Sequence, residues 1–199
     1  MMKPILLAGL CILVACQNVQ TFKSYETELS KLGFEKVDSI KLASGHLYRI
    51  TNFESAYVSK RNVDIWLPDT YNHQLKHQVL MMHDGQMLYD STTTWNQQEW
   101  QLDEHLTTLI ETQKVLPTLV ISTWNVTKDR HSDYFPQKPF DFLPDSTRSA
   151  LIQYNLKNSH RLFQQLPNSD AYLKFLVEEV KPMVDTTLKV YTNKEYTTI

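Results

Sequence analysis

The residues best suited to chemistry in this chain form a short polar turn, His83-Asp84-Gly85-Gln86, directly after the apolar run Val79 to Met82. Ligand sites in open α/β sheets form beyond the carboxyl ends of the parallel strands, which is where this turn is expected. Backbone N–H groups in such a turn can face a developing oxyanion. We therefore regard Asp84, Gly85 and Gln86 as candidate oxyanion-binding residues, although a tight turn with Gly85 at positive φ explains the pattern about as well.

A second polar group follows the next apolar run along the chain, Leu116 to Trp124. It consists of Trp124, Asn125, Arg130 and Tyr134. The carboxyl ends of parallel strands meet at one edge of a sheet, so we expect these residues and His83 to line the same pocket. Taken alone, their role would be structural, with Arg130 bound to a carboxylate that holds the loop.

Hydrophobic patterning predicts the elements that position these residues. The expected strands are Phe34 to Leu42, Leu47 to Phe53, Arg61 to Leu67, Val79 to Met82 and Leu116 to Trp124, and the expected helices are Asn96 to Gln113 and Asp170 to Val184. Ser44-Gly45 is a hairpin signal, so the first strands should be antiparallel. The later strand–helix alternation indicates parallel strands with helices on both faces, and the predicted fold class is therefore α/β. Thr147 to Gln165 could add a short helix.

The composition argues against several other classes of function. With only four glycines, the chain contains no GxGxxG, no Walker loop and no GxSxG. A net charge of −2 provides no basic surface for nucleic acid. The histidines are scattered and no HExxH occurs, so we expect neither a metal nor a cofactor. Asp103, Glu104 and His105 are consecutive helical positions that point in different directions, and we interpret them as a solvated helix face.

The N-terminus is typical of a targeting segment. Lys3 precedes an apolar run from Ile5 to Val14 that is too short to span a bilayer. Leu13-Val14-Ala15-Cys16 resembles a bacterial lipobox, which predicts a signal peptide over residues 1–15, lipidation of Cys16, a tether over residues 16–30 and a domain over residues 31–199. The alternative is an ordinary secretory signal with an incidental cysteine. A lipid-anchored chain would belong to the cell envelope, at the periplasm or outer membrane of a bacterium.

Five blocks of the sequence, in order, resemble the esterase family of α/β-hydrolases that includes enterochelin esterases, S-formylglutathione hydrolase and feruloyl esterases. The blocks are Val63 to Pro68, Met82 to Gln86, Trp100 to Leu106, Trp124 to Pro136 and Phe175 to Asp185. The resemblance implies ester cleavage by a serine, with an oxyanion-hole N–H near Gly85 and Gln86. It also implies that the nucleophile elbow and the whole Ser, Asp, His triad would follow Ile199. We therefore expect residues 31–199 to be an incomplete hydrolase domain that is inactive by itself.

Two functions remain open at this point. The first is a serine ester hydrolase of the cell envelope that acts on a small-molecule or carbohydrate ester. The second is a non-catalytic, lipid-anchored binding protein in which Trp95, Trp100 and Trp124 form a stacking surface for a carbohydrate or a siderophore-like ligand. Burial in the core is the other explanation of these tryptophans. In either case His83 precedes the expected serine and is not the catalytic histidine by chain order.

Overall fold

The computed structural model describes residues 25–157 and 166–199. The predicted signal peptide, Cys16 and the first part of the predicted tether lie outside these residues. The last part of the tether range differs from the expectation, because residues 25–31 are helical and the side chains of Tyr25 and Leu29 are buried in the core. The packed domain therefore includes this helix. No helix in the described ranges is long and apolar enough to cross a membrane.

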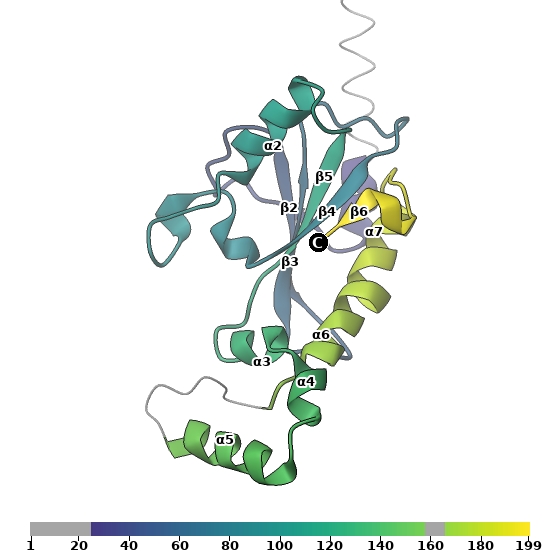
Figure 1. Cartoon of the computed structure of the whole chain (residues 1–199). Coiled ribbons are helices and arrows are strands. Elements are labelled where there is room, and N and C mark those ends of the chain that lie inside the picture. The colour runs from purple at the N-terminus through teal and green to yellow at the C-terminus, as the bar shows by residue number, and fades with distance from the viewer. Residues whose placement is uncertain (1–24, 158–165) are drawn as a thin grey trace, which may run out of the picture.

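A six-stranded mixed sheet forms the centre of the domain (Figure 1). Its strands are β1 (Glu35–Lys36), β2 (His46–Phe53), β3 (Arg61–Leu67), β4 (Gln78–His83), β5 (Thr118–Thr123) and β6 (Thr197–Thr198), in the order β1-β2-β3-β5-β4-β6. The pairs β1–β2, β2–β3 and β3–β5 are antiparallel, whereas β4 is parallel to both β5 and β6. This confirms the predicted α/β fold class, with antiparallel strands first and parallel strands after them.

Helices cover both faces of the sheet, as predicted. α2 (Leu102–Glu111) lies on one face, and α6 (Ser169–Lys174), the π-helical segment η3 (Phe175–Val180) and α7 (Lys181–Thr187) lie on the other. The remaining helices, α3 (Arg130–Tyr134), α4 (Gln137–Asp141) and α5 (Asp145–Lys157), lie beyond one end of the sheet (Figure 1). Alternate residues of β5 divide between two apolar clusters. Leu119 and Ile121 pack with α6, η3 and α7, whereas Val120 packs with Leu106 of α2. This alternation is the period of two that a sheet with two buried faces requires.

Two predicted boundaries are wrong for local reasons. The helix expected from Asn96 begins only at Leu102, because Gln97 and Gln101 adopt left-handed φ values of 55° and 52° that interrupt a right-handed helix. The strand expected over Phe34 to Leu42 is reduced to the two residues of β1. The chain then runs irregularly to Gly45, where φ is 81° and an added Cβ would lie 2.4 Å from the indole nitrogen of Trp66.

The helix predicted over Asp170 to Val184 exists, but its buried face differs from the stripe that its aliphatic residues and methionine predict. That stripe would contain Leu173, Leu176, Val177, Val180, Met183 and Val184. Leu173 and Val177 are exposed, whereas Leu176, Val180 and Val184 are buried as predicted, together with Tyr172 and Phe175. Residues 172, 176, 180 and 184 are spaced by four, but one turn of a regular α-helix contains 3.6 residues. In a regular helix these side chains would therefore move progressively around the axis and away from the sheet. The wider i→i+5 turn of η3 absorbs that drift, so one continuous helix keeps these residues on the sheet.

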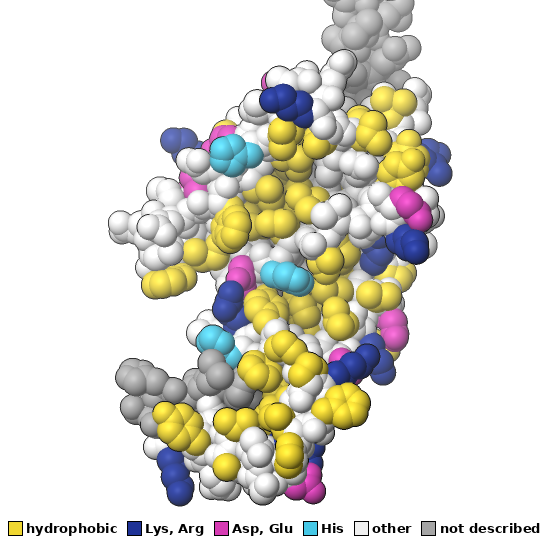
Figure 2. Space-filling model, in the orientation of Figure 1, with side chains coloured by type: hydrophobic (Ala, Val, Ile, Leu, Met, Phe, Trp, Pro, Cys, Tyr) yellow, Lys and Arg dark blue, Asp and Glu magenta, His cyan; other side chains and the backbone are white. Residues whose placement is uncertain are grey.

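The edge of β4 is only partly covered. Within the described residues, β6 pairs with β4 at Val79 and Leu80 alone, which leaves Met81 to His83 without a strand partner on that side. Figure 2 shows apolar side chains gathered along the middle of this face, in the region where Figure 1 places β4 between α2 and α7. The polar turn of the candidate site lies at the carboxyl end of the same strand.

Candidate active site

The turn after β4 presents two backbone donors. Asp84 adopts a left-handed conformation with φ 55°, and a 3-10 turn, η1 (Gly85–Met87), follows it. The N–H of Met87 donates to the carbonyl of Asp84 at 2.8 Å, but the N–H groups of Gly85 and Gln86 have no hydrogen-bond partner among the described residues. The left-handed residue is thus Asp84, so positive φ does not explain the glycine at position 85.

Close packing explains Gly85 instead. A Cβ added there would lie 2.8 Å from Cδ1 of Trp124 and 3.2 Å from Cβ of Ser122. Trp124 cannot easily move away, because its indole nitrogen donates to Oδ2 of Asp64 at 2.8 Å. The Arg49 guanidinium lies 4.4 Å from the centre of the Trp124 ring and also binds Asp64. Side chains from two strands, β2 and β3, thereby fix the indole against which the turn rests.

Asp84 is held by the polar group that follows β5. Its carboxylate accepts hydrogen bonds from Nδ2 of Asn125 at 2.7 Å, from the Tyr134 hydroxyl at 3.2 Å and from the Arg130 guanidinium. Burial alone would raise the pKa of Asp84, but these donors outweigh it and hold the pKa below its usual value. The structure therefore brings Asn125, Arg130 and Tyr134 together around Asp84. Of the five residues expected to line one pocket, only Trp124 and Asn125 line the hollow described below.

His83 has a partner that sequence reasoning missed. Its Nδ1 lies 2.8 Å from the hydroxyl of Tyr172 on α6, which in turn lies 2.8 Å from Oγ1 of Thr123. The imidazole also packs against the rings of Tyr134 and Tyr172, with centroids 5.2 and 5.6 Å away. Burial is the main cause that lowers the pKa of His83, so the imidazole is neutral at pH 7. Tyr172 lies four residues before the apolar Leu176, and residues four apart share one side of a helix. This spacing could have predicted that Tyr172 faces the sheet.

A buried ion pair anchors the segment that carries Tyr134. Nη2 of Arg61 lies 2.9 Å from Oδ2 of Asp133, and both side chains are completely shielded from solvent. The Arg61 guanidinium also lies about 5 Å from the ring centres of Tyr172 and Phe175. This pair ties α3 to β3 and so places Arg130 and Tyr134 beside the turn.

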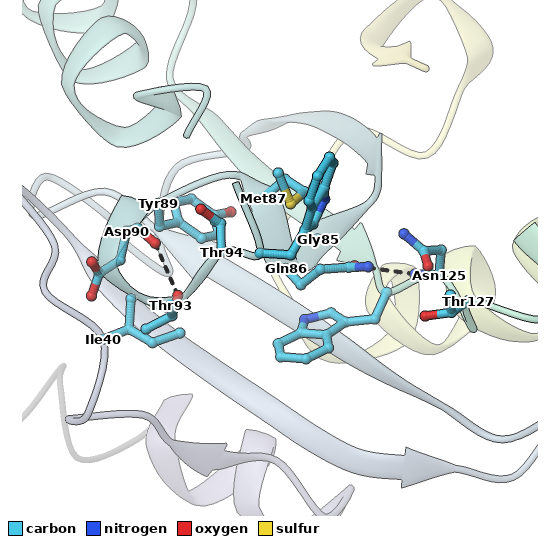
Figure 3. A pocket seen from close by; sticks show the side chains of 12 residues that line it. Ile40, Gly85, Gln86, Met87, Tyr89, Asp90, Thr93, Thr94, Asn125 and Thr127 are labelled. Atoms are coloured by element: carbon cyan, nitrogen blue, oxygen red, sulfur yellow. Dashed lines mark hydrogen bonds between the residues drawn. The ribbon is translucent and has the colours of Figure 1, made fainter. Parts of the chain in front are cut away.

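A hollow of about 320 Å³ adjoins the turn (Figure 3). It is lined by Ile40, Gly85, Gln86, Met87, Tyr89, Asp90, Thr93, Thr94, Trp95, Trp124, Asn125 and Thr127. The Trp95 side chain is 87% exposed and that of Trp100 is 65% exposed, so burial in the core does not explain these two tryptophans. Trp124 is half-buried. Within residues 25–157 and 166–199, no group of three or more His, Cys, Asp or Glu side chains could hold a metal ion.

No protein-family model and no curated protein matches this sequence. Similar solved structures include a CE1 ferulic acid esterase from Anaeromyces mucronatus, which is 15% identical with a TM-score of 0.43, over 82% of this chain and 50% of that one. An IroE-like serine hydrolase from Shewanella oneidensis is 18% identical with a TM-score of 0.49, over 72% of this chain and 39% of that one. The BES protein from Bacillus cereus is 12% identical with a TM-score of 0.49, over 82% and 53%.

The chain therefore spans about half the length of two of these structures and less of the third. A likeness this distant assigns neither an activity nor a substrate to the chain.

Proposed function

We propose that this chain forms the oxyanion side of a serine ester hydrolase. The observation that carries the proposal is the pair of backbone N–H groups on Gly85 and Gln86, at the carboxyl end of β4, which have no partner in the part of the chain that the structure describes. In the α/β-hydrolase fold, one oxyanion-hole donor comes from the loop at this place in the sheet, and the other from the residue after the nucleophile. Donors fixed in advance stabilise the negative oxygen of the tetrahedral intermediate without reorganising.

The surroundings of the turn suit this role. A free Asp84 carboxylate beside the two N–H groups would repel an oxyanion, because like charges interact strongly where water is partly excluded. Arg130 binds that carboxylate through two nitrogens, and Asn125 and Tyr134 donate to it as well. The charge of Asp84 is thus compensated within the loop, while its hydrogen bonds keep the turn in place.

The sequence contains no GxSxG, so the proposal assigns the nucleophile and its triad partners to residues that would follow Ile199, as the family resemblance implies. Residues 1–199 alone are then inactive toward esters. The substrate class is a small-molecule or carbohydrate ester. The proposal includes anchoring in the cell envelope through a lipidated Cys16, which the lipobox-like sequence Leu13 to Cys16 supports.

The first test is to read the gene past Ile199 and to assay its full product with p-nitrophenyl esters. We expect a GxSxG shortly after β6, and ester turnover that depends on its serine. Gln86→Pro removes one backbone donor and should lower turnover by about 10²–10³. Gln86→Ala keeps that N–H and is the matched control. Equal turnover in the two variants would remove the oxyanion role from this turn.

The 199-residue chain gives a separate test. It should cleave p-nitrophenyl acetate no faster than a Gly85→Pro control, and detectable excess turnover would contradict the assignment of the nucleophile to later residues.

The second candidate function is a binding protein without catalysis. The exposed Trp95 and Trp100 favour it, because large aromatic side chains in contact with water often mark binding sites. A gene that continues without a serine elbow, in a protein that still binds a ligand at this face, would decide for the binding protein.

A further inference from the structure

We infer that the hollow beside the Gly85–Gln86 turn is a subsite for a neutral, hydroxylated ring, such as one sugar unit, and that Trp95 is its stacking surface. The identification of this ring as part of an ester substrate rests on the proposed function. The binding of the ring does not, because it depends only on the residues that line the hollow.

The size of the hollow suits a single ring. Its volume of about 320 Å³ lies at the lower end of the roughly 300–1,000 Å³ typical of small-molecule sites. It is enclosed by the turn and by three segments, which contribute Ile40, residues between Tyr89 and Trp95, and residues between Trp124 and Thr127. Figure 3 shows Asp90, Thr93 and Thr94 on one side and Asn125 and Thr127 on the other, with Gln86 between them. Any ligand in the hollow therefore lies directly beside the proposed oxyanion donors.

The charges of the lining favour a neutral ligand. Among the described residues, no lysine or arginine lines the hollow, so no side-chain charge there would balance the full charge of an anionic ligand. Asp90 is the single acidic residue among the described residues of the lining, and both of its oxygens accept hydrogen bonds. Oδ1 accepts from the backbone N–H and hydroxyl of Thr92 at 2.9 and 2.6 Å, and Oδ2 accepts from the N–H of Lys41 at 3.0 Å. These bonds use three of the roughly four acceptor positions of the Asp90 carboxylate, so little of it is left to bind a cation.

The remaining polar atoms match hydroxyl groups. The hydroxyls of Thr93 and Thr94 donate to the carbonyls of Asp90 and Ser91, which leaves their oxygens as acceptors. Gln86 accepts the N–H of Asn125 with its carbonyl oxygen, so its NH₂ group is left to donate. A sugar has hydroxyl groups that both donate and accept hydrogen bonds, so it can bind to these acceptors and to this donor at the same time. An unsubstituted aromatic ring leaves them unsatisfied.

Trp95 supplies the apolar surface that such a ring needs. The C–H groups on one face of a sugar ring are apolar and pack against an aromatic face, as other apolar groups do. Trp95 lines the hollow and remains 87% exposed, whereas Trp100, on the same loop and 65% exposed, does not line it. Because both indoles are largely in water, either can be removed with little effect on folding. The chain thus offers a matched pair of variants.

The experiment titrates the protein with the methyl glycosides of glucose, galactose and xylose and follows binding by NMR. We expect at least one of them to bind. Trp95→Ala should weaken that binding about three- to tenfold, which corresponds to the energy of an aromatic contact, and Trp95→Phe should retain part of it. Trp100→Ala should bind as the unchanged protein does.

Three results would overturn the inference: no binding of any glycoside, an equal loss in Trp95→Ala and Trp100→Ala, or tighter binding of benzoate than of every glycoside. No ester is cleaved in this titration. Failure here therefore leaves the oxyanion proposal standing, and failure of the Gln86→Pro comparison leaves the ring subsite standing.

Discussion

Asp84 and Arg130 bind each other side by side: Nε of Arg130 lies 3.0 Å from Oδ1 of Asp84, and Nη2 lies 2.5 Å from Oδ2. Asp84 is also the residue that takes the left-handed conformation at the end of β4. Non-glycine residues adopt that conformation at a cost, so the bonds to its side chain help to keep it there. Arg130 thereby controls the shape of a turn that is 46 residues away in the sequence.

Arg130→Met should loosen this turn without unfolding the domain. The arginine is partly exposed, so we expect a loss of about 1 kcal/mol in the free energy of unfolding, together with faster hydrogen exchange at residues 84–87. Arg130→Lys keeps the charge but not the paired geometry. Its stability and its hydrogen exchange should lie between those of Arg130→Met and of the unchanged protein. Unchanged exchange at the turn in Arg130→Met would show that Asn125 and Tyr134 hold Asp84 without it.

Gly85→Ala should destabilise the protein by about 1–3 kcal/mol, because the new Cβ would lie only 2.8 Å from Cδ1 of Trp124. The measurement is urea denaturation of the single variant, of Trp124→Ala and of the double variant. Removal of the indole removes the clash, so the double variant should lose less stability than the sum of the two single changes. Strict additivity would contradict the contact as the reason for glycine.

Asp64→Asn should cost about 3 kcal/mol, the effect of leaving one member of a largely buried ion pair without its counter-charge. Asp64 is fully buried and binds both Arg49 and the indole nitrogen of Trp124. The control is Asp38→Asn, whose carboxylate is exposed and 3.9 Å from Lys36, and which should leave stability nearly unchanged. Similar small losses in both variants would argue against an essential pair at Asp64.

His77 should make stability depend on pH. Burial lowers its pKa, although the carbonyls of Lys189 and Leu75 near Nδ1 oppose this. Its buried Nε2 has no hydrogen-bond partner among the residues that the structure describes. Because the unfolded chain binds the proton more readily, stability should be full above the unfolded pKa of about 6.5 and fall as pH drops through the lowered folded pKa. His77→Asn keeps a donor near the Nδ1 position but cannot titrate.

Urea denaturation measured between pH 7.5 and 5 gives the free energy of unfolding at each pH. This free energy should fall less steeply with decreasing pH in His77→Asn than in the unchanged protein. His46 and His83 also have lowered pKa values, so some slope should remain. Identical slopes would show that His77 is protonated in the folded protein at little cost.

Much of the sheet could be predicted because its strands are continuous apolar runs, and the position of the turn followed from the end of one of them. The partners of the turn were harder to predict. Asp64 and Tyr172 lie about 60 and 90 residues from the groups they bind, and only the folded sheet brings them there. Asn125, Arg130 and Tyr134 could be predicted because each follows a neighbouring strand end.

The environment of Asp103 was predicted wrongly from its neighbours in the sequence. We expected a solvated helix face, but Asp103 is fully buried and Oδ2 accepts the backbone N–H groups of Ala43 and Ser44 at 2.7 and 3.3 Å. Those donors belong to the irregular stretch that replaced most of the expected first strand. A backbone segment without ladder bonds needs such acceptors, and nothing in the sequence near Asp103 indicates it.

The π-helical segment Phe175–Val180 acts as a one-residue insertion in an otherwise regular helix. Each residue of an α-helix turns the chain by about 100°, so deletion of the exposed Val177 would rotate one half of the helix against the other by about that angle. Either Tyr172 would leave His83, or Val180 and Val184 would leave the sheet. The insertion works as a spacer that lets one helix serve the core and the turn together, and a homologue that lacks it must hold its histidine in another way.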